Sequence, residues 1–141
     1  MTSGRSTYKE IFKKVKLETP KKIDKALQDT AVEVISKMID RTPVDTGAAK
    51  YHWFIRALPN EKFDKKRVDP SGAQPKARAK RDVKNLFRIG LECWLVNSAP
   101  YMIFLEQGSS TQAPQGVVAI TMQEVAPIFK KHIKTAISKP I

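Results

Sequence analysis

The stretch that decides the fold is "TPKKIDKALQDTAVEVISKMIDRTPVDTG", residues 19–47. Thr19 followed by Pro20 is typical of a helix start, with a hydroxyl at the N-cap and proline at the first helical position. The helix must end before Pro43, because the residue preceding a proline disfavours the helical conformation. Between these limits apolar residues recur every three or four positions, which predicts an amphipathic helix with one stripe facing the core. The stripe comprises Ile23, Leu27, Ala31, Val34, Ile35, Met38 and Ile39.

The end of this stretch, "TPVDTG" (residues 42–47), has the chemistry of a defined corner. Asp45 can accept a hydrogen bond from the main-chain N–H of Gly47 in an Asx turn, and Gly47 can adopt a positive φ. A strand is expected to follow, with Tyr51, Trp53, Ile55 and Ala57 on one face. The structural interpretation, a corner that stops a helix and directs a strand, is favoured over a ligand site. In an assembly the same exposed corner can also contact a neighbour.

Residues 58–75 differ in composition from the apolar segment before them. They are charged, contain Pro59, Pro70 and Pro75, and offer few apolar anchors, so we expect a long mobile loop. A short basic helix, about Lys76 to Asn85, is expected to lead out of it. Next, "LFRIGLECWLVNS" alternates in polarity, which predicts a long central strand. One face of that strand carries Phe87, Ile89, Leu91, Cys93 and Leu95.

The C-terminal third of the sequence predicts three short elements and a long one. Pro100 can open a short helix, "PYMIFLEQ", that Gly108 ends at its C′ position. "GVVAI", residues 116–120, is expected to be a short apolar strand. Thr121 and Glu124 are spaced as a capping box for a final helix. Since Pro127 would sit inside that helix, either the helix starts near Ala126 or it is kinked.

This order of elements predicts an α+β fold, a small and mostly antiparallel sheet packed by a long N-terminal and a long C-terminal helix, with a long mobile basic loop. A length of 141 residues suits one domain. We expect a basic N-terminal arm at residues 1–18 and a single α+β domain at 19–141, with a flexible insertion at about 58–75.

Charge is the strongest compositional signal, with a formal net charge of +12. Basic residues form two clusters, one in the N-terminal region and a second further along the chain. Such clusters suit contact with phosphate or with an acidic protein surface. A solvated surface is the alternative interpretation. The second cluster includes Lys62, Lys65, Lys66, Arg67, Lys76, Arg78, Lys80 and Arg81. The longest apolar runs are far shorter than the roughly 20 residues of a membrane span, so no membrane partner is expected.

The residues offer little for catalysis, and we expect no enzyme, no metal and no cofactor. His52, His132 and the single Cys93 are the only side chains that titrate near neutrality. A Cys93–His52 pair is conceivable in space, but a cysteine on the apolar face of a strand is usually a small buried hydrophobe. Glu106, beside Gly108, is interpreted as a local hydrogen-bonding group. A lone cysteine also fits folding in a reducing cytoplasm.

Two segments together resemble the paired signatures of the tail-completion and neck proteins of tailed bacteriophages. They are "TPVDTGAAKYHW" (residues 42–53) and "NSAPYMIFLEQGSSTQAPQGVV" (residues 97–118). The expected order of elements agrees with that family over roughly residues 20–138. Ala48 and Ala49, the charged insertion and the N-terminal arm depart from its pattern. The matching residues are Pro43, Val44, Asp45, Thr46 and Gly47 in the first segment, and Asn97, Pro100, Tyr101, Leu105, Glu106, Gly108, Gln112, Ala113, Pro114 and Gly116 in the second.

The resemblance implies a virion structural protein, made in the host cytoplasm, that forms a ring of expected sixfold symmetry at the head-proximal end of the tail. There it would end tail-tube growth and join tail to head, with the tail tube protein and head connector proteins as partners. The second cluster of basic residues would face DNA in the lumen. Candidate interface residues are Pro43, Val44, Asp45, Thr46, Gly47, Pro100, Tyr101, Met102, Phe104, Glu106 and Gly108.

Two alternatives remain open from the sequence. One keeps the virion but assigns a head-closure or tail-terminator ring of different stoichiometry. The other is a non-specific basic nucleic-acid-binding protein. That alternative predicts tight binding by the monomer that weakens steeply as salt rises.

Overall fold

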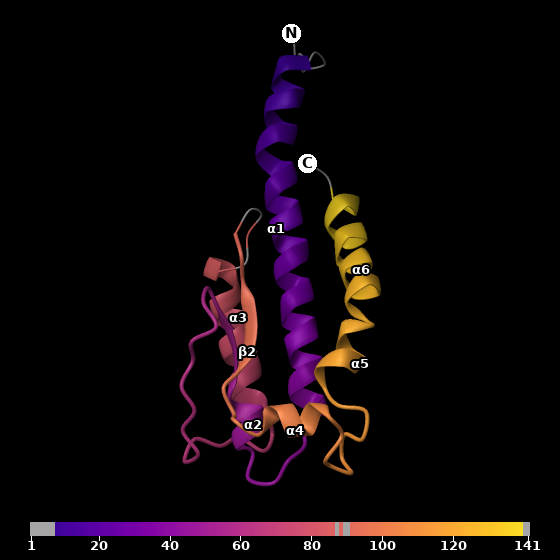
Figure 1. Cartoon of the computed structure of the whole chain (residues 1–141). Coiled ribbons are helices and arrows are strands. Elements are labelled where there is room, and N and C mark those ends of the chain that lie inside the picture. Colours follow the sequence, from indigo (N-terminus) through magenta and orange to yellow (C-terminus); the bar gives the residue numbers. More distant parts are fainter. Residues whose placement is uncertain (1–7, 87, 89–90, 140–141) are drawn as a thin grey trace.

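The computed structural model describes residues 8–86, 88 and 91–139, and within them it shows an α+β fold of six helices and one two-stranded antiparallel sheet. Helix α1 (Tyr8–Arg41) lies at the centre, with α3 (Ala73–Leu86) and the sheet on one side and α6 (Val125–Ser138) on the other (Figure 1). The shorter elements are α2 (Ala48–Tyr51), β1 (Trp53–Arg56), β2 (Trp94–Asn97), α4 (Met102–Glu106) and α5 (Val118–Met122). The predicted fold class is confirmed.

Helix α1 is longer than the sequence predicts, because it begins at Tyr8 and passes through Pro20. The predicted start at Thr19 is therefore wrong, and residues 8–18 of the expected arm are the first third of the helix. A proline inside a helix removes one hydrogen bond and crowds the preceding turn. The lysine- and glutamate-rich residues before Pro20 are good helix formers, which favours continuing the helix. Figure 1 shows this N-terminal part projecting beyond α3 and α6.

The core forms where the predicted stripe of α1 meets the other layers. Ile35 and Ile39 are fully buried, and Trp53 and Ile55 of β1 face the same cluster. Its further members come from α1, α3, α6 and the loop before α5: Ala31, Val34, Met38, Ala79, Val83, Ala113, Val117 and Ile128. Burial of these side chains is the main force that holds α3, the sheet and α6 against α1.

The sheet is smaller than predicted. Strands β1 and β2 pair with Trp53 opposite Asn97 and Arg56 opposite Trp94. The prediction of a long central strand around residues 86–97 is wrong in extent. Only Trp94–Asn97 forms a strand, because β1 offers only four residues to pair with. Phe87, Ile89 and Gly90 lie outside the described residues. Residues 48–51, which include the predicted start of the first strand at Tyr51, form α2 instead.

Two further predictions for the C-terminal third are corrected. "GVVAI" contributes to the helix α5 rather than a strand. Helix α6 has no side-chain capping bond at Glu124, so the capping box is absent. The carboxylate of Glu124 instead accepts a hydrogen bond from Arg41 at 2.6 Å, and the hydroxyl of Thr121 accepts one from Arg41 at 2.8 Å. The guanidinium of Arg41 in α1 thus engages the two side chains that the capping box would need, which explains why the capping box does not form. Pro127 lies in the first turn of α6, which agrees with the expected helix start near Ala126.

Helix α3 covers the outer edge of β1 through Arg78. The guanidinium donates to the main-chain oxygen of Tyr51 and, at 2.9 Å, to that of Trp53. It also lies over the ring of Phe54, 3.8 Å from the centroid. Burial lowers the pKa of Arg78 below its ordinary value. The strand edge is thereby closed to other chains. Among the described residues, no helix combines the length and the apolar character that crossing a membrane requires.

Candidate functional site

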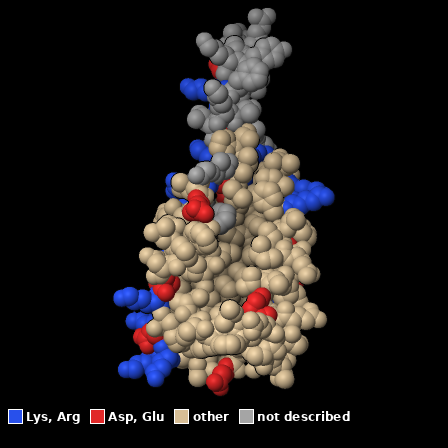
Figure 2. All heavy atoms as spheres, in the orientation of Figure 1, with Lys and Arg blue, Asp and Glu red and all other residues tan. Residues whose placement is uncertain are grey.

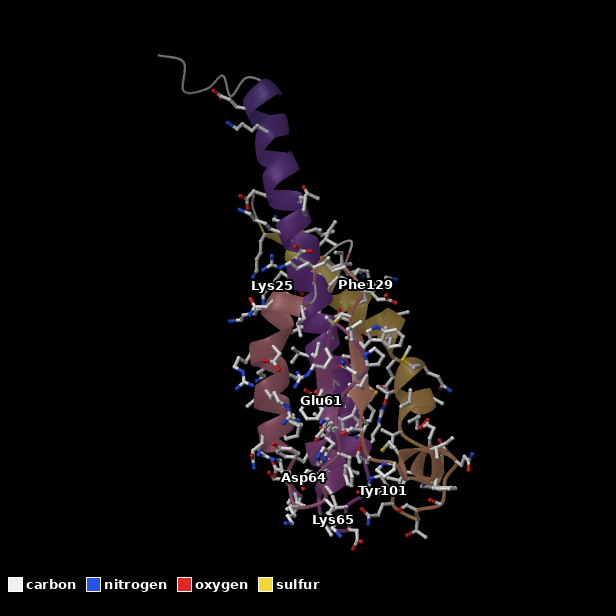
Figure 3. All side chains as sticks on the ribbon, turned by 60° about the vertical axis from the view of Figure 1, so that its left-hand side comes forward. Lys25, Glu61, Asp64, Lys65, Tyr101 and Phe129 are labelled. Atoms are coloured by element: carbon white, nitrogen blue, oxygen red, sulfur yellow. The ribbon has the colours of Figure 1, made fainter. Side chains whose placement is uncertain are left out.

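The two sequence motifs meet at one end of the molecule, around a pocket of about 580 Å³. The first motif, residues 42–53, runs from the end of α1 through α2 to the start of β1, and the second, residues 97–118, runs from the end of β2 through α4 to the start of α5. Phe63 and Lys65 of the long loop complete the rim, and Figure 3 shows Lys65 and Tyr101 at this same end. The remaining lining residues are Pro43, Val44, Asp45, Thr46, Gly47, Ala48, Ala49, Leu105, Ser110 and Gln112. We call this the corner pocket.

A side-chain amide joins the two motifs directly. The Oε1 of Gln112 accepts a hydrogen bond from the main-chain N–H of Val44 at 2.9 Å, and its Nε2 donates to the main-chain oxygen of Val44 at 3.0 Å. A second amide acts in the same way at the other side of the corner. Asn97 donates from Nδ2 to the oxygen of Ala49 at 2.8 Å, and its Oδ1 accepts from the N–H of Ala99 at 2.9 Å. The side-chain amides of Gln112 and Asn97 therefore both bind main-chain groups.

Thr42 fixes the direction in which the chain leaves α1. Its hydroxyl donates to the main-chain oxygen of Met38 at 2.6 Å and accepts from the indole N–H of Trp53 at 2.8 Å. Both Thr42 and Trp53 are buried. The hydroxyl satisfies the indole N–H inside the core, where an unpaired donor would be costly.

Gly47 is required by its backbone conformation and its surroundings. Its φ is +93°, and a Cβ at this position would lie 2.4 Å from the nitrogen of Pro70. The N–H of Asp69 donates to the Gly47 oxygen at 3.0 Å, so the glycine is packed against the loop. The predicted positive φ is confirmed. The predicted Asx turn is not, because no hydrogen bond among the described residues joins Asp45 to Gly47; the Thr46 hydroxyl accepts instead from Ala48 at 3.2 Å.

Glu106 caps the first turn of α5. Its carboxylate accepts from the main-chain N–H groups of Val117 and Val118, each at 2.6 Å, and of Ala119 at 3.0 Å. Burial raises the pKa of Glu106, but these three hydrogen bonds outweigh it and hold the pKa below its ordinary value. A carboxylate engaged in this way is a poor general base, which agrees with its interpretation as a local hydrogen-bonding group. Gly116 has a φ of +82°, and a Cβ there would lie 2.4 Å from the main-chain oxygen of Glu106.

The predicted interface residues divide into two groups. Pro43, Val44, Gly47, Met102, Glu106 and Gly108 are buried or half-buried parts of the corner. Asp45, Thr46, Pro100, Tyr101 and Phe104 are exposed at or beside it. The structure adds Ile103, which lies next to Phe104 in α4 and is 61% exposed. Sequence reasoning missed Ile103, although α4 is too short to bury every side of its apolar sequence. Their interface role stays a prediction.

The predicted DNA-facing residues also divide. Lys62, Lys65, Lys66 and Arg67 are exposed on the loop, and Lys80 and Arg81 on α3. Lys76 contacts Asp40 at 2.5 Å, and Arg78 is turned inward against β1. Arg78 is therefore turned away from the exposed basic surface, whereas Lys76 is half-buried and paired at the surface; the contact of these residues with DNA stays a prediction. Figure 2 shows lysines and arginines gathered mainly at the edges of the face on which β2 and α4 lie.

The long loop is irregular between Arg56 and Ala73, as predicted, and is anchored to the body. Glu61 contacts the guanidinium of Arg56 at 2.6 Å. The ring of Phe63 lies 4.6 Å from that of His52, centroid to centroid, and the N–H of Asp64 donates to the His52 Nε2 at 3.1 Å.

His52 and Cys93, the pair considered for catalysis, have separate surroundings. His52 is buried and its Nδ1 lies 2.7 Å from the Ala48 oxygen, so both of its nitrogens are engaged by main chain. The conceivable pairing of His52 with Cys93 is therefore not formed. Burial raises the pKa of Cys93. Within the described part of the chain, no three His, Cys, Asp or Glu side chains are grouped so that they could hold a metal ion.

Comparisons with known proteins found no matching family model, no matching curated protein and no matching solved structure.

Proposed function

We propose that this protein is a virion structural protein of a tailed bacteriophage, of the neck or tail-completion type. It forms a ring at the head-proximal end of the tail, where it ends tail-tube growth and joins the tail to the filled head. Its partners are further copies of itself, the tail tube protein and head connector proteins. A ring made by heterologous contacts needs two different faces on each subunit.

The observation that carries this proposal is the union of the two motifs at the corner pocket. The motifs are far apart in the sequence, yet Gln112 of the second holds Val44 of the first through two hydrogen bonds. The residues that produced the resemblance thus form one structural unit. If the two motifs are the signature of one structural corner, their residues must contact each other, and Gln112 and Val44 do.

The distribution of exposed groups also supports an assembly protein. Tyr101, Ile103 and Phe104 are exposed large side chains at the end of the body beside the corner. Neighbouring exposed apolar groups mark protein contacts more often than isolated ones do. The exposed lysines of the loop, Lys62, Lys65 and Lys66, suit contact with DNA passing through a ring, and Lys65 lines the corner pocket together with Tyr101.

The test is to block the gene with an amber codon in the phage that encodes it and to examine lysates by electron microscopy. Filled heads and separate tails that fail to join, or tails of irregular length, are expected. The matched control is the same phage grown in a suppressor host, which restores the protein and should restore joined virions. Normal infectious particles from the non-suppressing host would overturn the proposal. Tight, salt-sensitive DNA binding by the purified monomer would then favour the nucleic-acid-binding alternative.

A further inference from the structure

A basic groove of about 450 Å³ lies where α1, α3 and α6 meet, and it shares no lining residue with the corner pocket. Lysines of the two basic clusters of the sequence come together here, Lys25 from the N-terminal region and Lys80 and Lys84 from α3. Figure 3 places Lys25 toward one end of the body and Lys65 and Tyr101 toward the other. The remaining lining residues are Gln28, Asp29, Val32, Glu33, Val83 and His132. We call this the α3 groove.

The two carboxylates of the α3 groove are already paired with other side chains. The Oδ1 of Asp29 lies 2.8 Å from the Nζ of Lys25, one turn away on α1. The Oε1 of Glu33 lies 2.6 Å from the Nζ of Lys131 and 2.9 Å from the Nε2 of His132. The hydrogen bond from Lys131 is the main cause that lowers the pKa of Glu33. Both carboxylates therefore have their charge compensated from outside α3.

Lys80 and Lys84 remain as uncompensated cations. Both are exposed, and neither forms an ion pair or a hydrogen bond with another residue that the structure describes. They are four residues apart, so their side chains are neighbours on one face of α3. Lys76, one turn earlier, differs because its charge is paired with Asp40. The positive potential of the α3 groove thus comes mainly from two adjacent lysines.

The lining favours a phosphodiester backbone over a protein segment as the occupant. Two adjacent cations complement a row of anionic groups, which a nucleic-acid backbone presents at short, regular intervals. A protein partner usually buries aromatic or large apolar anchors at the centre of a contact. The described lining includes no Phe, Tyr or Trp, and its two valines, Val32 and Val83, pack in or against the core.

The same lining favours double-stranded over single-stranded nucleic acid. Single strands are bound largely by stacking their bases on aromatic side chains. The imidazole of His132 is the one ring in the lining, and it is held by Glu33. A duplex keeps its bases stacked inside and presents its phosphates outward, so it needs no such ring. The backbone of double-stranded DNA therefore matches the α3 groove best.

We propose that the α3 groove binds the phosphate backbone of double-stranded DNA through Lys80 and Lys84. Each ammonium group is a point charge on a flexible stem and can adjust to one phosphate. Phosphate contacts position a duplex without reading its sequence. Two contacts make the binding by one copy weak, unlike the tight monomer binding that the nucleic-acid-binding alternative predicts. This binding goes beyond the proposed function and does not depend on it, because the groove belongs to a single copy.

The test is fluorescence anisotropy of a labelled double-stranded DNA of mixed sequence, titrated with the full-length protein over a series of salt concentrations. The variant Lys80→Ala/Lys84→Ala removes both cations, and alanine is the best helix former, so α3 should still fold. The slope of log K against log salt is about −0.9 per contacted phosphate, so the variant's slope should be shallower by about 1.8. From about 50 to 200 mM salt, the wild type should therefore lose about tenfold more affinity than the variant.

The matched control is Lys130→Ala/Lys134→Ala, which removes the same charge at the same spacing from exposed positions of α6. Its salt slope should stay close to that of the wild type. A third variant, Lys62→Ala/Lys66→Ala, removes two exposed lysines of the long loop and reports on that surface separately. Circular dichroism verifies that each variant is folded.

Three outcomes overturn the inference. If Lys80→Ala/Lys84→Ala and the α6 control flatten the slope equally, the DNA responds to net charge alone. If only Lys62→Ala/Lys66→Ala flattens the slope, the loop is the DNA contact. If Lys80→Ala/Lys84→Ala weakens binding of labelled polyglutamate but not of DNA, the occupant is an acidic protein segment.

The phage experiment reports separately on the proposed function. A flattened slope in Lys80→Ala/Lys84→Ala together with normal virions would retain the DNA site and reject the proposed function. Unjoined heads and tails together with an unchanged slope would retain the proposed function and reject the DNA site.

Discussion

Gln112 holds the main chain of Val44 by two hydrogen bonds, one in each direction, across 68 residues of sequence. This pairing directly connects the segment that follows α1 with the loop that precedes α5. The corner pocket exists because these two segments lie against each other. Residues of both motifs are therefore expected to matter first for the shape of this end of the molecule, and through that shape for any partner that binds it.

Replacing Gln112 with alanine should loosen the corner. The change removes both hydrogen bonds to Val44 at an exposed position, so the expected loss in the free energy of unfolding is about 1 kcal/mol. Urea unfolding followed by circular dichroism measures it. Gln115→Ala, in the same exposed loop, is the matched control and should leave stability unchanged. Equal stability of both variants would mean that water replaces the amide without cost.

Gly47→Ala should be more damaging than Gln112→Ala. A non-glycine residue at a φ of +93° is strained, and the added Cβ would overlap Pro70, so the expected loss is at least about 2 kcal/mol. Thermal unfolding measures the effect, with Asp45→Ala as the control at an exposed position of the same corner. A Gly47→Ala variant as stable as the wild type would show that the loop at Pro70 is free to move away.

Acid should destabilise the protein partly through Glu106. Its pKa is held below the ordinary value of 4.5 by three main-chain hydrogen bonds that outweigh burial. A carboxyl group whose pKa is lowered in the folded state stabilises the fold fully above its unfolded pKa. That contribution disappears as the pH falls through the lowered folded pKa. Stability should therefore decline below about pH 4.5.

Glu106→Gln tests this explanation. The variant should be less stable than the wild type at neutral pH, and its unfolding free energy should depend less steeply on pH below about 4.5. Denaturant unfolding at a series of pH values from neutral to acid gives both quantities. The matched control is Glu92→Gln, which removes an exposed carboxylate of the same type without touching α5. An unchanged acid slope in Glu106→Gln would assign the pH dependence to other carboxylates, such as Glu33, whose pKa is also lowered.

The apolar stripe of the central helix and the positive φ of Gly47 were predictable because local chemistry decides them. The stripe that includes Ile35 and Ile39 has helical spacing, and the glycine at position 47 has no alternative that tolerates its φ. The element at Val118–Met122 was not predictable as a helix. Its short apolar sequence suits a strand equally well, and a carboxylate twelve residues away at Glu106 decides the matter by capping the helix. Long-range partners of this kind leave no local signal.

The site was predictable only in part, for the same reason. The motif residues could be named from the sequence. The sequence did not indicate that the side-chain polar groups of Asn97, Glu106 and Gln112 bind main-chain groups of the same molecule. Arg78 illustrates the limit. It belongs to a run of basic residues, and nothing in that run marks the one whose guanidinium turns inward to β1. Exposed lysines and a buried arginine look alike when only the charge pattern is read.

Arg78→Met should destabilise the protein and open the edge of β1. The variant loses the charged donor to the oxygens of Tyr51 and Trp53 and the contact over Phe54, for an expected loss of about 2–3 kcal/mol. The uncovered strand edge should also raise aggregation on heating. Arg78→Lys should recover little, because an ammonium cannot reproduce the planar guanidinium that donates to both oxygens and stacks on the ring.

Arg81→Met, on the exposed side of the same helix, is the matched control. Its contact with Asp82 is a surface ion pair and should contribute little to stability. Chemical unfolding compares the three variants, and light scattering during heating reports aggregation. If Arg78→Met and Arg81→Met behave alike, Arg78 is only one more surface cation and the edge of β1 is protected by the packing of α3 alone. If Arg78→Lys equals the wild type, charge rather than guanidinium geometry closes the edge.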